Sequence, residues 1–178
     1  MTLANPAMHS DITDCLDEDL DGLEEAFEPV VEDSRILVVD DDARMAILMC
    51  RLLERDGFRR VVAARDGQRA VEILFDHPPD VVVLDVHLPR LDGFEVLREI
   101  LRHDFERGRV TGIVAISGDT APSTCQSMLW AGADDFITRP FANAEFALRV
   151  RRIAQRTRAL RRALGHARLL EGRLRGVS

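Results

Sequence analysis

Residues 36–40 read ILVVD and residues 81–85 read VVVLD, and these two short runs decide the fold. Each is a run of β-branched and aliphatic residues closed by an aspartate, which is typical of a strand buried on both faces of a parallel sheet. Three similar runs, RVVAA, IVAIS and DFIT, predict strands at residues 60–64, 113–117 and 135–138. We therefore expect five parallel strands.

Amphipathic segments separate these runs and predict helices between the strands. The clearest apolar face has helical spacing and consists of Met45, Leu48, Met49, Leu52 and Leu53. This helix should end at Gly57, and others are predicted at residues 67–75, 93–103 and 123–131, with Asp92 capping the one at 93–103. Right-handed crossovers between parallel strands then give a doubly wound α/β domain of about residues 35–145.

Composition limits the classes of protein to consider. The chain has 178 residues, of which 46% are hydrophobic, and a net charge of −7, which is ordinary for one globular core. It has no run of about 18 apolar residues and no secretory leader pattern in residues 1–10, so we expect a cytoplasmic protein. Cys15, Cys50 and Cys125 are widely spaced, which favours reduced thiols over a disulfide framework or a zinc site.

Charge is strongly segregated along the chain. Residues 1–34 carry eleven acids and no lysine or arginine, whereas residues 149–178 carry ten arginines and one acid, Glu171. All 24 basic residues are arginine, because the sequence contains no lysine.

The acidic extension, residues 1–34, contains an apolar stripe. Its members are spaced by three or four residues and are Ile12, Leu16, Leu20, Leu23 and Phe27. The stripe predicts an amphipathic helix that docks on the domain or on the basic helix, and a disordered solubilising tail is the alternative.

The last predicted helix begins near Asn143 and runs on through residues 146–178. Apolar and small residues recur in a seven-residue repeat, namely Phe146, Val150, Ile153, Thr157, Leu160, Leu164, Ala167, Glu171 and Leu174. This repeat predicts a coiled-coil seam that joins two copies of the chain, and a long solvated helix that folds back on the domain is the alternative. In a parallel pair Arg156 would face Arg161 of the second helix, so something anionic should offset these charges.

Polar side chains follow the predicted strands at one edge of the sheet. Asp40 and Asp41 close the first strand, Asp85 closes the third, Ser117 closes the fourth and Arg139 follows the fifth. In a doubly wound sheet this edge is where ligands bind. Three neighbouring carboxylates repel one another unless a cation is present, and Mg²⁺ prefers such oxygen ligands.

These residue types suit phosphoryl transfer. With Mg²⁺ bound, the Asp85 carboxylate could attack a phosphoryl group, while Ser117 hydrogen-bonds one phosphoryl oxygen and Arg139 pairs with another.

Four motifs, in this order, resemble the receiver domain of two-component response regulators. They are VVDD at residues 38–41, LDVHLPRLDG at 84–93, AISG at 115–118 and FITRPF at 136–141. The resemblance covers about 110 of the 178 residues. It implies a flavodoxin-like sheet of strand order 2-1-3-4-5 that acts as a phosphorylation switch, and not as an enzyme with a separate substrate.

The same resemblance implies the role of each site residue. Asp85 would accept phosphate from a histidine kinase or phosphotransfer protein. Asp40, Asp41, Asp85 and the backbone carbonyl of His87 would hold Mg²⁺. Ser117 and Phe136 match the switch positions, and the bond before Pro140 would be cis. Arg139 stands where the family bears lysine, so a degenerate receiver that works without phosphorylation is an alternative.

Weaker signals in the sequence point to two other functions. The pair Asp40 and Asp42, with Asp134 and Asp135, resembles the acidic motifs of haloacid-dehalogenase-like phosphatases, but those enzymes use a lysine. The Arg-rich helix could contact nucleic acid, although residues 149–178 contain no aromatic residue for stacking. Output would come from a partner or from a domain that follows the helix.

Overall fold

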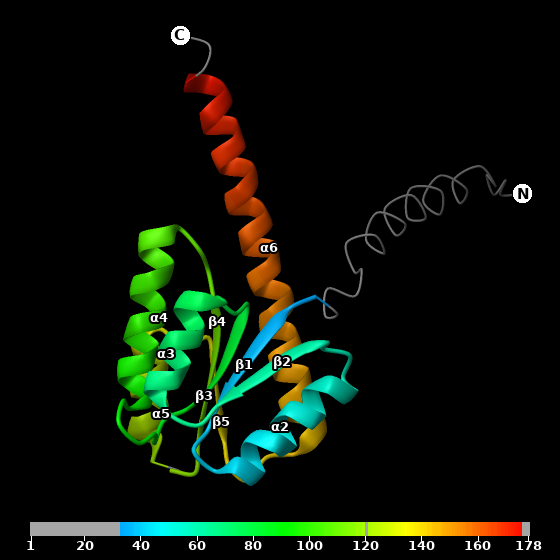
Figure 1. Ribbon diagram of the computed structural model, residues 1–178, viewed down its shortest axis with the longest axis vertical. Helices are drawn as coiled ribbons and strands as arrows, with labels where there is room; N and C mark the ends of the chain where they lie inside the picture. The colour runs from blue at the N-terminus through cyan, green and yellow to red at the C-terminus, as the bar shows by residue number, and fades with distance from the viewer. Residues whose placement is uncertain (1–32, 120, 176–178) are drawn as a thin grey trace, which may run out of the picture. The chain divides into compact units, whose positions relative to one another are not determined.

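The computed structural model describes residues 33–119 and 121–175, with side chains up to residue 170. Strands and helices alternate along this part of the chain (Figure 1). In chain order they are β1 (Arg35–Val39), α2 (Ala43–Arg55), β2 (Arg60–Ala64), α3 (Gly67–Asp76), β3 (Val81–Asp85), α4 (Gly93–Arg107), β4 (Gly112–Ser117), α5 (Pro122–Ala131), β5 (Asp135–Thr138) and α6 (Asn143–Arg175).

The five strands form one parallel sheet of order β2-β1-β3-β4-β5, as predicted. Two of the three inner strands, β3 and β4, are buried along their whole length, because helices cover both faces of the sheet. This burial explains why both strands are continuous apolar runs with no polar alternation.

Two apolar cores lie on opposite faces of the sheet. Helices α2 and α6 pack on one face, where Met49, Leu53 and Phe146 meet the inward residues of the sheet. Helices α3, α4 and α5 pack on the other, around Leu74, Leu97 and Met128 (Figure 1). The fold is therefore the three-layer doubly wound arrangement that the sequence predicts.

Local signals differ from the structure in two places. Helix α4 continues to Arg107, four residues beyond its predicted end, and Gly108 ends it in a left-handed conformation at φ 56°. Asp92 caps its start with a full capping box, as expected. In α2, Leu48 was expected on the buried apolar face but is 41% exposed, whereas Ala46, which was not included in that face, is buried.

Helix α6 starts at Asn143, as predicted, and extends past the amino-terminal edge of the sheet (Figure 1). The first four positions of the heptad series, Phe146, Val150, Ile153 and Thr157, are buried against the sheet of the same chain. The prediction that the whole series forms an intermolecular seam is therefore wrong for these four. A seven-residue repeat cannot tell packing on a sheet from packing on a second helix.

Four arginines of α6 form ion pairs with aspartates of the same domain. Arg149 pairs with Asp135, Arg151 with Asp56, Arg156 with Asp134 and Arg161 with Asp80. The offsetting charge that we expected for Arg156 and Arg161 is thus supplied by aspartates of the sheet's own loops. The apolar stripe of residues 12–27 and its docking lie outside the described residues.

Two absences hold for the described part of the chain. Cys50 and Cys125 form no disulfide there. None of the described helices combines the length and the apolar character needed to cross a membrane.

Candidate functional site

The first part of the site is the turn that follows β1. The backbone N–H of Asp40 still donates to Ala64 O at 3.1 Å, so this residue remains tied to the sheet. Its carboxylate is fully buried and accepts a hydrogen bond from the N–H of Asp42 at 2.9 Å. The neighbouring Asp41 is exposed. The turn thus offers one buried and one accessible carboxylate.

Asp85 is the last residue of β3 and lies beside this turn. It is only 5% exposed, and it pairs in register with Ile116 of β4. The N–H of His87 donates to Asp85 Oδ1 at 3.1 Å. The loop that follows brings Gly93 close to the end of β3. A Cβ on Gly93 would lie only 2.5 Å from Asp85 O. Glycine is needed for this close approach, which the sequence analysis overlooked in the LDG stretch.

The sheet brings the three aspartates together at its carboxyl edge. Asp40, Asp41 and Asp85 each offer a carboxylate oxygen, and these oxygens lie within 4.8 Å of one another. Three oxygen donors at this spacing fit a hard divalent cation such as Mg²⁺, which takes carboxylates and keeps part of its water shell.

Arg139 is the cation already present at this edge. Its N–H donates to Ser117 O at 2.8 Å, which anchors the residue beside β4. Its Nη2 lies 2.5 Å from Asp40 Oδ2 and 3.1 Å from Asp85 Oδ2. The peptide bond to Pro140 is cis, as predicted. The sequence predicts that Arg139 pairs with a phosphoryl group, but carries no sign that its guanidinium bridges two of the carboxylates.

The site is short of positive charge. Burial raises the pKa of the Asp40 carboxyl to about 6, even though the Arg139 guanidinium beside it acts to lower that pKa. The nearby charges of Asp85 and Asp41 add to the rise. One guanidinium thus faces three carboxylates, and an added cation would stabilise their ionised forms.

Ser117 lies on β4, the strand next to that of Asp85, and Phe136 lies on β5, one strand further from it. Ser117 ends β4 and is fully buried, and its Oγ accepts a hydrogen bond from the N–H of Asp119 at 3.0 Å. Phe136 is the second residue of β5 and packs, half-buried, against the core on the side of α3, α4 and α5. Asp119 is an additional residue of this edge that the sequence analysis did not single out.

The acidic residues of the phosphatase alternative do not join the site. Asp42 caps α2 by accepting from the N–H of Arg44 at 2.8 Å. Asp135 begins β5, and Asp134 precedes it, so both lie at the opposite edge of the sheet from Asp40. Their carboxylates pair with Arg149 and Arg156. The acidic pair needed for that chemistry is therefore not assembled.

Comparison with known proteins agrees with this geometry. The sequence model of the response regulator receiver domain matches residues 36–151. The response regulator MprA of Mycobacterium sp. (strain KMS) is 39% identical over 127 residues, which are 69% of this chain and 51% of that protein. A protein-glutamate methylesterase/protein-glutamine glutaminase of Symbiobacterium thermophilum is 40% identical over 122 residues, 66% of this chain and 32% of that protein.

A solved structure extends the comparison to three dimensions. The receiver domain of the Francisella response regulator 1452 superposes with a TM-score of 0.63 at 30% identity, covering 70% of this chain and 99% of that one. The chain spans about half the length of the MprA relatives that it matches, and a third of the methylesterase. From the family match and the assembled acidic edge, the chain belongs to the response regulator receiver domain family.

Proposed function

We propose that the chain is a phosphorylation-dependent switch that accepts a phosphoryl group on Asp85 from a histidine kinase or phosphotransfer protein. The observation that carries the proposal is the convergence of Asp40, Asp41, Asp85 and Arg139 at one edge of the sheet. Structural roles alone do not account for three adjacent carboxylates, because such crowding costs stability.

Asp40, Asp41, Asp85 and the carbonyl of His87 would hold Mg²⁺. When bound, the ion neutralises charge on the carboxylates and on the incoming phosphoryl oxygens. Asp40 is held in place by the N–H of Asp42, and Asp85 by the N–H of His87, so both carboxylates are positioned before any ligand arrives.

The Asp85 carboxylate is the nucleophile of the proposed reaction. One of its oxygens forms the new bond to phosphorus, and the bond from phosphorus to the donor nitrogen breaks with its electron pair leaving on the donor. The Ser117 hydroxyl then donates to one phosphoryl oxygen and Arg139 pairs with another. Hydrolysis of the acyl phosphate resets the site, so the chain turns over only its own phosphate.

Phosphoryl transfer is tested by incubating the full chain with acetyl phosphate and Mg²⁺. We expect intact-mass spectrometry to show one added phosphoryl group, and peptide mapping after borohydride reduction to place it on Asp85. Omitting Mg²⁺ should prevent the addition. A chain that never gains mass, and that does not bind beryllofluoride, would favour the degenerate receiver instead.

Arg139→Ala should weaken binding of beryllofluoride, which mimics the aspartyl phosphate. A charge-assisted hydrogen bond contributes about 1.5–3 kcal/mol, so the dissociation constant should rise by roughly 10- to 150-fold. Isothermal titration in Mg²⁺ measures this effect, and Arg139→Lys, which restores the family residue, should recover most of the affinity. Equal affinity in all three proteins would assign Arg139 a purely structural role.

Ser117 and Phe136 are the proposed switch residues. Rotation of the Ser117 side chain toward the phosphoryl group would move its Oγ away from the N–H of Asp119, from which it accepts a hydrogen bond. Phe136 lies on the neighbouring strand, where Ala115 is its register partner, so a shift of β4 reaches it directly.

Output is proposed to pass through the distal part of α6. Leu160 and Leu164 are 42% and 40% exposed, and they continue the heptad series beyond the buried Thr157. Since only about two heptads remain there, we expect a homodimer that is weak and concentration-dependent. Nucleic-acid contact by this helix is less favoured, because four of its arginines already pair with aspartates of the domain.

Replacing both Leu160 and Leu164 with glutamate should give monomers. The matched control is Leu169→Glu, on the same helix but outside the heptad series, which should leave the dimer intact. Sedimentation equilibrium at micromolar concentrations measures both. If the unchanged chain is already monomeric at high micromolar concentration, the proposed dimer is wrong.

A downstream partner, or an output domain in a longer chain, would receive the signal. The relatives support this proposal, because the matched region covers only 51% of MprA and 32% of the methylesterase. A cytoplasmic location stays a prediction.

A further inference from the structure

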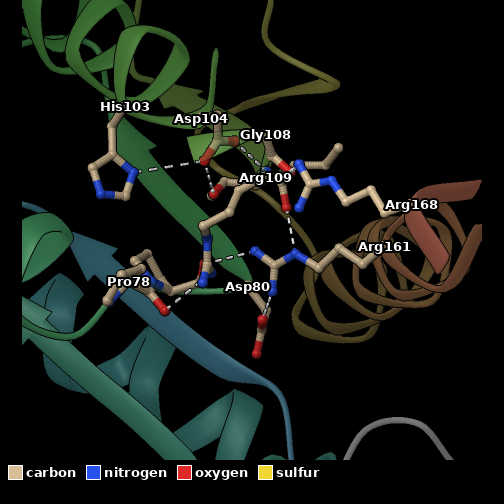
Figure 2. A network of polar contacts seen from close by, with 11 residues as sticks. Pro78, Asp80, His103, Asp104, Gly108, Arg109, Arg161 and Arg168 are labelled. Atoms are coloured by element: carbon tan, nitrogen blue, oxygen red, sulfur yellow. Dashed lines mark hydrogen bonds and ion pairs between the residues drawn. The ribbon is translucent and has the colours of Figure 1, made fainter. Parts of the chain in front are cut away.

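The apolar support of α6 ends at Thr157, yet the helix remains in contact with the domain for about three further turns. Thr157 is 4% exposed and is the last buried residue of the helix among those whose side chains are described. Beyond it, polar contacts replace apolar ones (Figure 2). They come from Arg161 and Arg168, which share a helix face with Thr157 because they lie four and eleven residues further on.

Arg161 connects α6 to two loops at the amino edge of the sheet. Its guanidinium forms an ion pair with Asp80, which directly precedes β3. Its Nε donates to Val110 O at 2.6 Å, and its Nη2 donates to Pro79 O at 3.1 Å. The side chain is only 23% exposed. Figure 2 shows it reaching from the helix into this edge.

Asp80 makes this contact rigid because it is itself held on several sides. Its Oδ2 accepts from the N–H of Arg35 at 2.7 Å, and its carbonyl accepts from the N–H of Gly112 at 2.9 Å. One residue thus joins the starts of β1, β3 and β4. Gly112 also lets the helix approach, since a Cβ there would overlap with Ile153 and Thr157.

Arg168 repeats the contact two turns later. Its Nη2 donates to Gly108 O at 2.7 Å, in the loop that ends α4. This hydrogen bond is exposed, whereas those of Arg161 are partly buried. We therefore expect Arg168 to contribute less, since exposed polar contacts add little.

We infer that Arg161 is the positioning residue that fixes the direction of the distal part of α6 relative to the receiver domain. A planar guanidinium with several donors can bridge a carboxylate and two carbonyls at once, which a lysine ammonium on its flexible chain does less well. Without this bridge the helix beyond Thr157 would lose its partly buried contacts with Asp80, Pro79 and Val110, while the exposed hydrogen bond of Arg168 would remain. The importance of this direction for output rests on the proposed function, but the bridge itself does not.

The direct test measures the distance between two spin labels, one at Ser127 on α5 and one at Ala167 on α6, by double electron–electron resonance. The background carries serine at all three cysteines, and labelled chains are diluted with unlabelled ones to exclude signals between copies. We expect one narrow distance distribution in the parent and in Arg162→Ala, a variant of the adjacent exposed arginine. Arg161→Ala should give a distribution at least twice as broad.

Two milder variants guard against loss of folding. Asp80→Asn removes the ion pair, and Arg161→Lys keeps the charge but loses the planar guanidinium with its several donors. Both variants should broaden the distance distribution to an intermediate degree. If Arg161 merely stabilised the fold, its replacement would lower the urea midpoint of unfolding and leave the distance distribution narrow. Narrow distributions in all Arg161 and Asp80 variants would overturn the inference. Beryllofluoride binding by the same variants reports separately on the proposed function, since it should be unchanged.

Discussion

Asp85→Asn should abolish phosphoryl addition from acetyl phosphate. An asparagine side chain has nearly the same shape but presents an amide in place of the attacking carboxylate oxygen, so no acyl phosphate can form. The fold should survive, because the change also removes one of three crowded negative charges at the carboxyl edge. Intact-mass spectrometry after incubation with acetyl phosphate and Mg²⁺ should show complete loss of the adduct.

Asp119→Asn is the matched control for this change. Asp119 lies at the same edge, and its carboxylate accepts from the N–H of Ala121 at 2.9 Å, which an asparagine oxygen can also do. This variant should still be phosphorylated. Persistence of the adduct in Asp85→Asn would move the acceptor to another carboxylate, and Asp41 would then be the first to replace.

Phe146→Ala should destabilise the chain by about 3–5 kcal/mol. Phe146 is fully buried, with a relative exposure of 0%. Its ring stacks on that of Phe141, with the two ring centroids 5.1 Å apart. Truncation leaves a cavity between α6 and the sheet that the neighbouring strands cannot fill. Urea unfolding followed by circular dichroism, at low protein concentration, measures the loss.

Leu164→Ala provides the comparison within the same heptad series. Leu164 is 40% exposed, so its truncation should change the free energy of unfolding by no more than about 0.5 kcal/mol. The contrast separates the part of the helix that belongs to the domain from the part that extends beyond it. Similar small losses for both variants would contradict the burial of Phe146.

The strands were predictable because burial on both faces leaves a direct mark on the sequence. VVVLD is apolar until its last residue, and the observed β3 spans the same five positions. The series in α6 was harder to interpret, because Val150, buried on the sheet, and Leu164, partly exposed beyond it, satisfy the same spacing. Their difference is set by how far the sheet extends beneath the helix, which is a property of the assembled domain.

The site residues follow from a geometric rule, since parallel strands deliver their carboxyl ends to one edge. That rule brings Asp40 and Asp85 together without knowledge of either loop. It does not determine that one arginine nitrogen contacts both carboxylates, because that contact depends on side-chain rotamers. The contacts of Arg161 with Pro79 and Val110 were equally hidden, as backbone carbonyls leave no signal in sequence.

The acidic edge and the projecting part of α6 lie at opposite edges of the sheet, so two partners can reach them separately. Asp85 ends its strand at one edge of the sheet, and α6 leaves the domain past the other (Figure 1). A donor as large as a folded domain can therefore approach the aspartates while a second chain occupies the far end of the helix. If the chain works as proposed, phosphorylation of Asp85 and contact of α6 with a second chain need not exclude each other, and a complex could be phosphorylated again without dissociating.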